Sequence, residues 1–243
     1  MRRSGNAYQA LNRAMGKAIH DYDMIRDGER ILVGLSGGSD SLALLWMLAE
    51  RRPRVRVAYH LEAAYIDPGF GGRAGEAMRP FCERLEVGLR VEANDFGVMS
   101  HGPLNRENPC FLCARLRRKR LFEIAAERGC SVLALGHNKD DVIETLFLNI
   151  CFAGEISTMR PAQDMFSGRF RVIRPLAYAE ADLVRRFANE RQLPVRANPC
   201  PSAGRSRRSD IQHLLQQLYR SNPKIKGNIF RAMRHLKPEY LLK

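Results

Sequence analysis

The chain alternates short segments typical of buried strands with longer segments of helical periodicity. Strands are predicted at residues 31–35, 55–59, 88–92, 131–135 and 171–174. The intervening stretches predict helices at 8–22, 41–51, 74–85, 113–128, 141–151 and 180–191. Two short helices are expected near the C-terminus, at 210–219 and 228–236.

This alternation predicts an α/β fold with a Rossmann-like, doubly wound and mainly parallel sheet, because parallel strands need crossover helices. We expect an N-terminal helix in residues 1–27 and an α/β domain in 28–196. Residues 197–243 should form a cysteine-bearing loop and short C-terminal helices packed on the same domain. Ligands of such sheets bind beyond the carboxyl ends of the strands, where loops lead into helices.

The loop after the first predicted strand is rich in glycine and serine, and reads Leu35-Ser36-Gly37-Gly38-Ser39-Asp40-Ser41. Adjacent glycines let the backbone turn tightly and approach an anion, while serine hydroxyls and the next helix donate hydrogen bonds. Asp40 would repel phosphate unless it holds a cation, so we place it near Mg²⁺. The simpler interpretation is a glycine turn followed by a serine helix cap.

The loop after the fourth predicted strand ends in an acidic pair at a helix start. It reads Gly136-His137-Asn138-Lys139-Asp140-Asp141. Acidic residues at this position cap a helix and interact favourably with its dipole. Taken alone, this pair needs no further explanation.

Two of the six cysteines form a Cys-x-x-C element, Cys110 and Cys113, and Cys200 lies in a distant proline-rich loop. The element is compatible with half a zinc site, a redox dithiol or part of an iron–sulfur site. Three cysteines make an incomplete structural zinc site but suit a [4Fe-4S] cluster with one open iron. Zinc is the alternative, completed by a nearby histidine or water. The remaining cysteines are expected to be buried structural thiols: Cys82, Cys130 and Cys151.

The chain is strongly basic, with 40 Lys and Arg against 26 Asp and Glu and a formal net charge of +14. Such a balance favours an extended polyanion such as RNA, although a generally basic surface is the simpler interpretation. Basic residues follow both cysteine elements: Arg115, Arg117, Arg118, Lys119 and Arg120, and then Arg205, Arg207 and Arg208. Helical spacing places Arg117 and Arg120 on one face and Arg118 on another, and some of these charges are expected only to be solvated.

No membrane-spanning segment is expected, because the longest apolar run, residues 42–49, is far too short to cross a bilayer. The N-terminal residues carry arginines without the apolar stretch of a signal peptide. We therefore expect a soluble, cytoplasmic protein.

The glycine loop resembles the Ser-Gly-Gly-x-Asp-Ser signature of the PP-loop ATP pyrophosphatases, and the second loop is similar to their Gly-His-x-x-Asp-Asp motif. Residues 109–118, which include Cys-Phe-Leu-Cys-Ala-Arg-Leu-Arg-Arg, look like a segment of the tRNA 2-thiocytidine synthetases. Residues 145–149 and 174–178 also match that family in order and spacing. The likeness extends over roughly residues 31–240.

The resemblance implies an adenine nucleotide alpha-hydrolase-like PP-loop fold that binds ATP and Mg²⁺ between the two loops. It implies nucleotide-site roles for Gly136 and His137, and a role for Asp140 or Asp141 in holding Mg²⁺ or aiding base activation. It also implies that a tRNA base, first of all cytidine in the anticodon loop, is adenylated and that sulfur then displaces AMP.

In that family two cysteines of C-x-x-C and one later cysteine hold the cluster, which corresponds to Cys110, Cys113 and Cys200. Related thiolases place a functional basic residue four positions after the second cysteine, which corresponds to Arg117. The implied partners are tRNA and a sulfur donor such as a cysteine desulfurase, and the implied assembly is a homodimer.

The chain departs from the family pattern at two positions. Ser39 stands where many members have lysine, and Ala203 stands where a second late cysteine is common. These two departures keep one alternative open, a zinc-stapled RNA-binding protein with a degenerate PP-loop. The enzymatic alternative is another PP-loop ligase, such as a lysidine synthetase-like enzyme.

Overall fold

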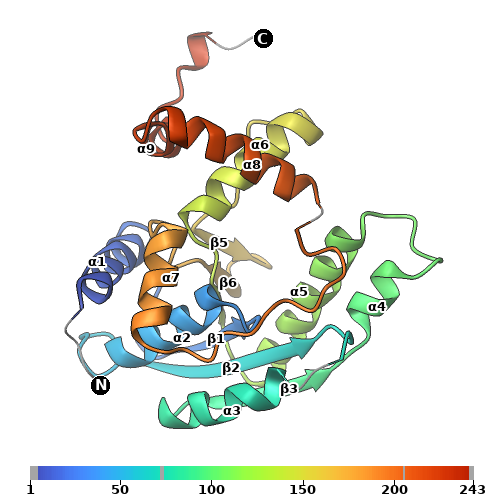
Figure 1. Cartoon of the computed structure of the whole chain (residues 1–243). Helices are drawn as coiled ribbons and strands as arrows, with labels where there is room; N and C mark the ends of the chain where they lie inside the picture. Colours follow the sequence, from blue (N-terminus) through green and yellow to red (C-terminus); the bar gives the residue numbers. More distant parts are fainter. Residues whose placement is uncertain (1–4, 72–73, 205, 241–243) are drawn as a thin grey trace.

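The computed structural model describes residues 5–71, 74–204 and 206–240, so Arg205 lies outside the described residues. A twisted six-stranded sheet with the order β3-β2-β1-β4-β6-β5 forms its centre (Figure 1). All neighbouring pairs are parallel except β5 and β6. The strands are β1 (Glu29–Leu35), β2 (Tyr59–Asp67), β3 (Gly88–Ala93), β4 (Val132–Leu135), β5 (Ala162–Met165) and β6 (Phe170–Ile173).

Helices cover both faces of the sheet, as the predicted doubly wound α/β fold requires. The helices are α1 (Asn6–Asp21), α2 (Ser39–Arg51), α3 (Ala74–Arg84), α4 (Phe96–His101), α5 (Pro109–Glu127), α6 (Lys139–Ala153), α7 (Ala181–Glu190), α8 (Arg207–Ser221) and α9 (Ile225–Ala232), followed by the 3-10 turn η1 (Pro238–Tyr240). The main core joins α1, α2, α3 and α7 to one face, and a second cluster joins α5 to the other. The predicted fold class is confirmed.

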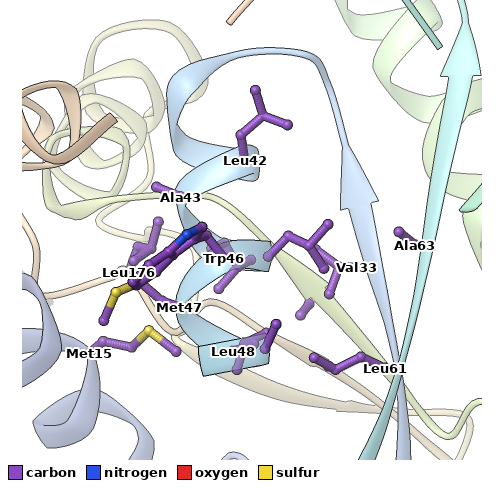
Figure 2. Packing of buried hydrophobic residues seen from close by; sticks show 14 of the residues in the cluster. Met15, Val33, Leu42, Ala43, Trp46, Met47, Leu48, Leu61, Ala63 and Leu176 are labelled. Carbon is purple, nitrogen blue, oxygen red and sulfur yellow. The ribbon is translucent and has the colours of Figure 1, made fainter. Parts of the chain in front are cut away.

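The main core is centred on α2, whose apolar residues are buried on nearly every side. Figure 2 shows Trp46 and Met47 packed towards Leu176 and Met15, while Val33 of β1 lies on the sheet side. The ring of Trp46 also contacts Phe187 of α7 edge-on, with centroids 5.2 Å apart. Because β1 is hydrogen-bonded on both sides and α2 is buried, the loop that joins them is held between rigid elements.

The C-terminal helices α8 and α9 pack on α6 rather than directly on the sheet (Figure 1). Ile143 of α6 and Ile211 and Leu215 of α8 form a separate small core. Figure 1 shows the chain after α7 passing the start of α2 and reaching α5 before it enters α8. The expected division into residues 1–27, 28–196 and 197–243 stays a prediction.

Two details of the predicted elements were wrong or missing. The strand predicted at 55–59 begins only at Tyr59, because Tyr59 pairs with Glu29 at the start of β1, and residues 52–57 form turns before it. The sequence also gave no sign of β5 or α4. Cys82 and Cys130 are buried as expected, whereas Cys151 is exposed near the end of α6, so that part of the prediction was wrong.

Within the described ranges, every helix is too short or too polar to cross a membrane.

Candidate active site

The glycine loop forms a tight, internally bonded turn between β1 and α2. Gly37 has φ +80°, a conformation that residues with a side chain rarely adopt. The hydroxyl of Ser41 accepts a hydrogen bond from the backbone N of Ser36 at 3.0 Å and donates to the carbonyl oxygen of Gly38 at 3.2 Å. The turn is therefore preorganised at the N-terminus of a buried helix, where an anion is favoured.

The second loop lies against the first, because β4 is the direct neighbour of β1. Asn138 caps α6 and accepts hydrogen bonds from the backbone N atoms of Asp140 and Asp141 at 2.8 and 3.1 Å. Its Nδ2 also donates to Asp40 across the two loops at 3.4 Å. A Cβ on Gly136 would lie only 2.8 Å from the backbone N of Ser41. The sequence-predicted loops therefore meet, and Gly136 permits their close approach.

We expect the Gly136→Ala substitution to separate the two loops, because its Cβ would collide with backbone atoms that have little freedom to move. The variant should lose about 1–3 kcal/mol of unfolding free energy, the usual cost of overpacking. Its ATP affinity should fall in parallel. Thermal unfolding and calorimetric ATP titration measure the two effects.

The matched control is Gly227→Ala in α9, where a Cβ meets nothing within 4 Å. This substitution should leave ATP affinity unchanged and stability the same or slightly higher, because alanine favours a helix more than glycine does. Equal behaviour of the two variants would show that the close approach at Gly136 is unimportant.

Asp40 and Asp141 bring two acidic side chains together at the junction of the loops. Burial first, and then the charge of Asp141, raise the pKa of Asp40 to about 6. Burial also raises the pKa of Asp141, although its bond from the backbone N of Asn138 and the charge of Arg208 act in the opposite direction. Arg208 Nη1 contacts Asp141 Oδ1 at 3.0 Å. Two crowded carboxylates favour a bound cation, which would relieve their repulsion.

Asp140 has a different geometry from Asp141. Its Oδ1 contacts Lys226 Nζ at 2.7 Å, and its Oδ2 accepts from the backbone N of Ala181 at 2.9 Å. These contacts join α6 to α7 and α9. Asp140 lines a neighbouring cavity of about 380 Å³ together with Asp40 and Asp141, but not the cavity that contains the glycine loop.

A cavity of about 300 Å³ contains both loops and one side of α5. Eight of the predicted nucleotide-site or catalytic residues line it, together with Arg118: Leu35, Ser36, Asp40, Ser41, Arg117, Gly136, His137 and Asp141. The buried Nε of Arg117 has no hydrogen-bond partner among the described residues. Gly37, Gly38 and Ser39 form the turn but do not line this cavity.

The expected orientation of the α5 arginines was partly wrong. Arg118 lines the same cavity as Arg117, whereas Arg120 points to a carboxylate cluster and contacts Glu92 at 2.7 Å. The cavity lies between the directions in which residues 117 and 118 leave the helix, so both side chains line it. Arg207 lies over the ring of Phe152 at 4.8 Å and is not a lining residue.

His137 is half-buried in the wall of this cavity. Burial, followed by the charges of Arg174, Arg208 and Arg118, lowers the pKa of His137 to about 3. Its Nδ1 accepts a hydrogen bond from Nε of Arg174 at 3.3 Å. Sequence reasoning included Arg174 in a matching motif but gave it no role in the site, because nothing in the sequence shows that its charge is buried.

The three predicted cysteines gather at the N-terminus of α5. Asn108 caps this helix, with Pro109 in its first turn, and accepts from the backbone N of Phe111 at 3.2 Å. Burial raises the pKa of Cys113; the charge of Arg117 opposes this, and the charges of Cys200 and then Cys110 add to it. The third cysteine, distant in sequence, is therefore an electrostatic neighbour of the C-x-x-C pair. Cys113 precedes Ala114, which lines the nucleotide cavity.

His101 of α4 holds the loop that carries Cys200. Its Nε2 lies 2.6 Å from Ser202 Oγ and 3.9 Å from Cys200 Sγ. Its Nδ1 lies 2.8 Å from the carbonyl oxygen of Gly97, which only accepts, so Nδ1 donates; in the tautomer with its hydrogen on Nδ1, Nε2 accepts from Ser202. No sequence signal identified His101, because a single histidine outside any motif is uninformative.

A backbone hydrogen bond connects the same loop to the glycine turn. The N atom of Arg196 donates to the carbonyl oxygen of Gly37 at 2.9 Å. The segment that leads to Cys200 therefore passes directly over the glycine turn.

The donor set at α5 fits an iron–sulfur cluster better than a single ion. In the described part of the chain, no three Cys, His, Asp or Glu side chains lie close enough together to hold one metal ion. Each cysteine of a cluster binds a different iron, so its sulfur ligands lie farther apart than those of zinc. The three thiols, with Arg117 beside them, supply the sulfur ligands that a cluster site needs.

The PP-loop domain profile matches residues 7–218 of the chain. The fold, the glycine turn and its capping loop thus define a PP-loop protein. The tRNA-cytidine(32) 2-sulfurtransferase of Geobacter sulfurreducens is 37% identical over 238 residues, which cover 97% of this chain and 93% of that protein. The enzyme of the same name from Pelobacter propionicus is 36% identical and covers 97% and 88%. The chain belongs to the tRNA-cytidine(32) 2-sulfurtransferase family.

A solved structure of a related enzyme has the same architecture. The U34-tRNA thiolase NcsA from Methanococcus maripaludis, solved with its [4Fe-4S] cluster, has a TM-score of 0.80 and 26% identity. The match covers 97% of this chain and 81% of NcsA. The resemblance drawn from the sequence motifs is therefore confirmed at the level of fold and family.

Proposed function

We propose that this protein is an ATP-dependent tRNA sulfurtransferase that replaces the 2-oxygen of cytidine 32 in the anticodon loop with sulfur. Family membership and the name of its relatives support this substrate. The observation that carries the proposal is the convergence of the glycine turn, the capping loop and the cysteine-bearing helix on one cavity. Both halves of a thiolation reaction need such a shared site.

The first half is adenylation of the base. ATP phosphates would lie on the glycine turn and the N-terminus of α2, and Asp40 and Asp141 would hold Mg²⁺, which neutralises phosphate charge when bound. The base oxygen attacks the α-phosphorus, a C–O–P linkage forms, and pyrophosphate leaves. Adenylation converts a poor oxygen leaving group into AMP. Arg117, whose Nε lacks a partner among the described residues, is positioned to stabilise the developing phosphate charge.

The second half replaces AMP with sulfur at the same carbon. Cys110, Cys113 and Cys200 would hold a [4Fe-4S] cluster, which when bound supplies the sulfur chemistry. His101 and Ser202 hold the loop of Cys200, and the charge of Arg117 partly offsets the burial that raises the pKa of Cys113. A sulfur donor such as a cysteine desulfurase and a homodimeric assembly are parts of this proposal.

Anaerobic purification with iron, sulfide and zinc analysis tests the site, and mass spectrometry of tRNA nucleosides tests the reaction. We expect about four irons per chain. A strain that lacks the protein should lose 2-thiocytidine and regain it with the wild-type gene. Zinc alone without ATP binding would instead support a zinc-stapled RNA-binding protein. ATP-dependent formation of lysidine without a cluster would support the other ligase.

A further inference from the structure

Arg174, which directly follows β6, is a buried cation without a counter-ion. Its side chain is only 6% exposed. Nε donates to His137 Nδ1 at 3.3 Å, and Nη1 donates to the carbonyl oxygen of Arg160 at 2.5 Å. Both acceptors are neutral, and no carboxylate among the described residues forms an ion pair with this guanidinium. A buried charge without an opposite charge is costly, so its presence calls for an explanation.

A second cation, Arg118 of α5, lies near enough to Arg174 for the two charges to interact. Arg118 is exposed to solvent and lines the 300 Å³ cavity together with His137. Burial first, and then the charge of Arg118, lower the pKa of Arg174 to about 10. The two guanidinium groups therefore repel one another, with Arg118 lining the cavity and Arg174 buried behind the lining residue His137. Arg118 also has no carboxylate partner among the residues that the structure describes.

Other arginines of the same region are neutralised. Arg120 contacts Glu92, Glu123 and Glu127, and Arg115 contacts Glu107 at 3.0 Å. Arg208 contacts Asp141 and Glu144. Across the described ranges of the chain, Arg118 and Arg174 thus lack the carboxylate partners that these three neighbouring arginines have.

His137 adds a neutral donor to the two cations. Because its Nδ1 accepts from Arg174, the ring hydrogen is on Nε2. Because the pKa of His137 is lowered to about 3, the positive charge here is carried by the arginines. The fork of Arg118 and one imidazole N–H donor match the oxygens of a phosphate group, which arginine binds in a bidentate manner. The charge of Arg174 behind His137 adds to the attraction for an anion.

We propose that Arg118 and His137, with the buried charge of Arg174 behind them, form a phosphate subsite that lies beside the glycine turn and binds one phosphate of a substrate. The proposal rests on the proposed function, which supplies two sources of this chemistry. One source is ATP, and the other is the tRNA backbone next to the target base. The bound phosphate balances the two charges that repel one another in the free protein.

The test compares Arg118→Gln with wild type in two binding titrations, one with a non-hydrolysable ATP analogue and one with tRNA at several salt concentrations. Loss of a charge-assisted contact should weaken one of the two ligands by about tenfold or more. If tRNA supplies the phosphate, the slope of log affinity against log salt should also fall by about one. If ATP supplies it, only the nucleotide titration should change.

The matched control is Arg115→Gln, which removes the same charge from the same helix but at a position already neutralised by Glu107. It should change either affinity by no more than about twofold, the effect of an exposed ion pair. A second variant, Arg174→Lys, keeps the buried charge but loses the planar fork that holds His137 and the carbonyl oxygen of Arg160, and should weaken the same ligand as Arg118→Gln. Without ligand, Arg118→Gln should unfold at the same or a slightly higher temperature than wild type, because the repulsion between Arg118 and Arg174 is relieved.

The subsite is wrong if Arg118→Gln binds both ligands as tightly as Arg115→Gln does, while wild type binds both. That result leaves the proposed function intact, because iron content and 2-thiocytidine formation are measured separately. Failure of the wild-type protein to bind either ligand would overturn the subsite and the proposed function together.

Discussion

Cys200→Ser is expected to remove the iron from the anaerobically purified protein and to lower 2-thiocytidine formation at least about a hundredfold. Changing a residue that only hydrogen-bonds to a metal ligand already lowers metal affinity or activity about tenfold to a hundredfold. A serine hydroxyl is also a harder and weaker ligand for iron than a thiolate. ATP affinity should remain within about twofold of wild type, because Cys200 does not line the nucleotide cavity. Iron analysis, nucleoside mass spectrometry and calorimetry measure the three quantities.

Cys151→Ser is the matched control, since it changes an exposed thiol near the end of α6 that is outside the proposed site. Iron content and product formation should both stay at the wild-type level. Full iron content and activity in Cys200→Ser would remove the third cysteine from the proposed cluster.

Asp40→Asn is expected to change activity and stability in opposite directions. The pKa of Asp40 is raised to about 6, which means that the fold disfavours its carboxylate. Stability is therefore lost as pH rises from about 4 to about 6, and it remains lost above that range. The amide avoids this cost, so the free energy of unfolding of the variant should be about 1–3 kcal/mol higher than that of wild type at pH 8. Near pH 4 the difference should vanish.

The same substitution should lower pyrophosphate release at least about a hundredfold, because a neutral amide does not replace a carboxylate beside Mg²⁺. Urea denaturation at pH 4 and pH 8, without ATP or Mg²⁺, measures the stability change. The control Asp164→Asn alters an aspartate that is 68% exposed, and it should leave both quantities nearly unchanged. A loss of stability at pH 8 in Asp40→Asn would contradict the interpretation of its pKa.

The sequence was sufficient to predict the fold and the meeting of the two loops. Alternating strands and helices required a parallel sheet, and parallel neighbours present their carboxyl ends at one edge. The glycine turn, Gly136 and His137 all lie at this edge, after β1 and β4. These are local patterns combined with a general rule of topology, so they could be inferred without coordinates.

The remaining site residues depend on contacts between distant segments. His101 matters only because α4 places it against the loop of Cys200, and its own sequence neighbours give no indication of that contact. Arg118 was assigned to the wrong face because helical spacing gives relative directions, not the direction in which the cavity lies. The burial of Arg174 results from tertiary packing around β6. The polar strand β5 lacks the alternation that would have identified it.

The bond from the N atom of Arg196 to the carbonyl oxygen of Gly37 limits how far the two halves of the reaction can separate. Four residues lead from Arg196 to Cys200, and a fully extended chain of that length spans at most about 14 Å. As long as this bond persists, Cys200 stays within that distance of the residue bonded to the glycine turn. An insertion between Arg196 and Cys200 would lengthen this connection and allow the cysteine site to move away from the glycine turn, although every reactive group was kept.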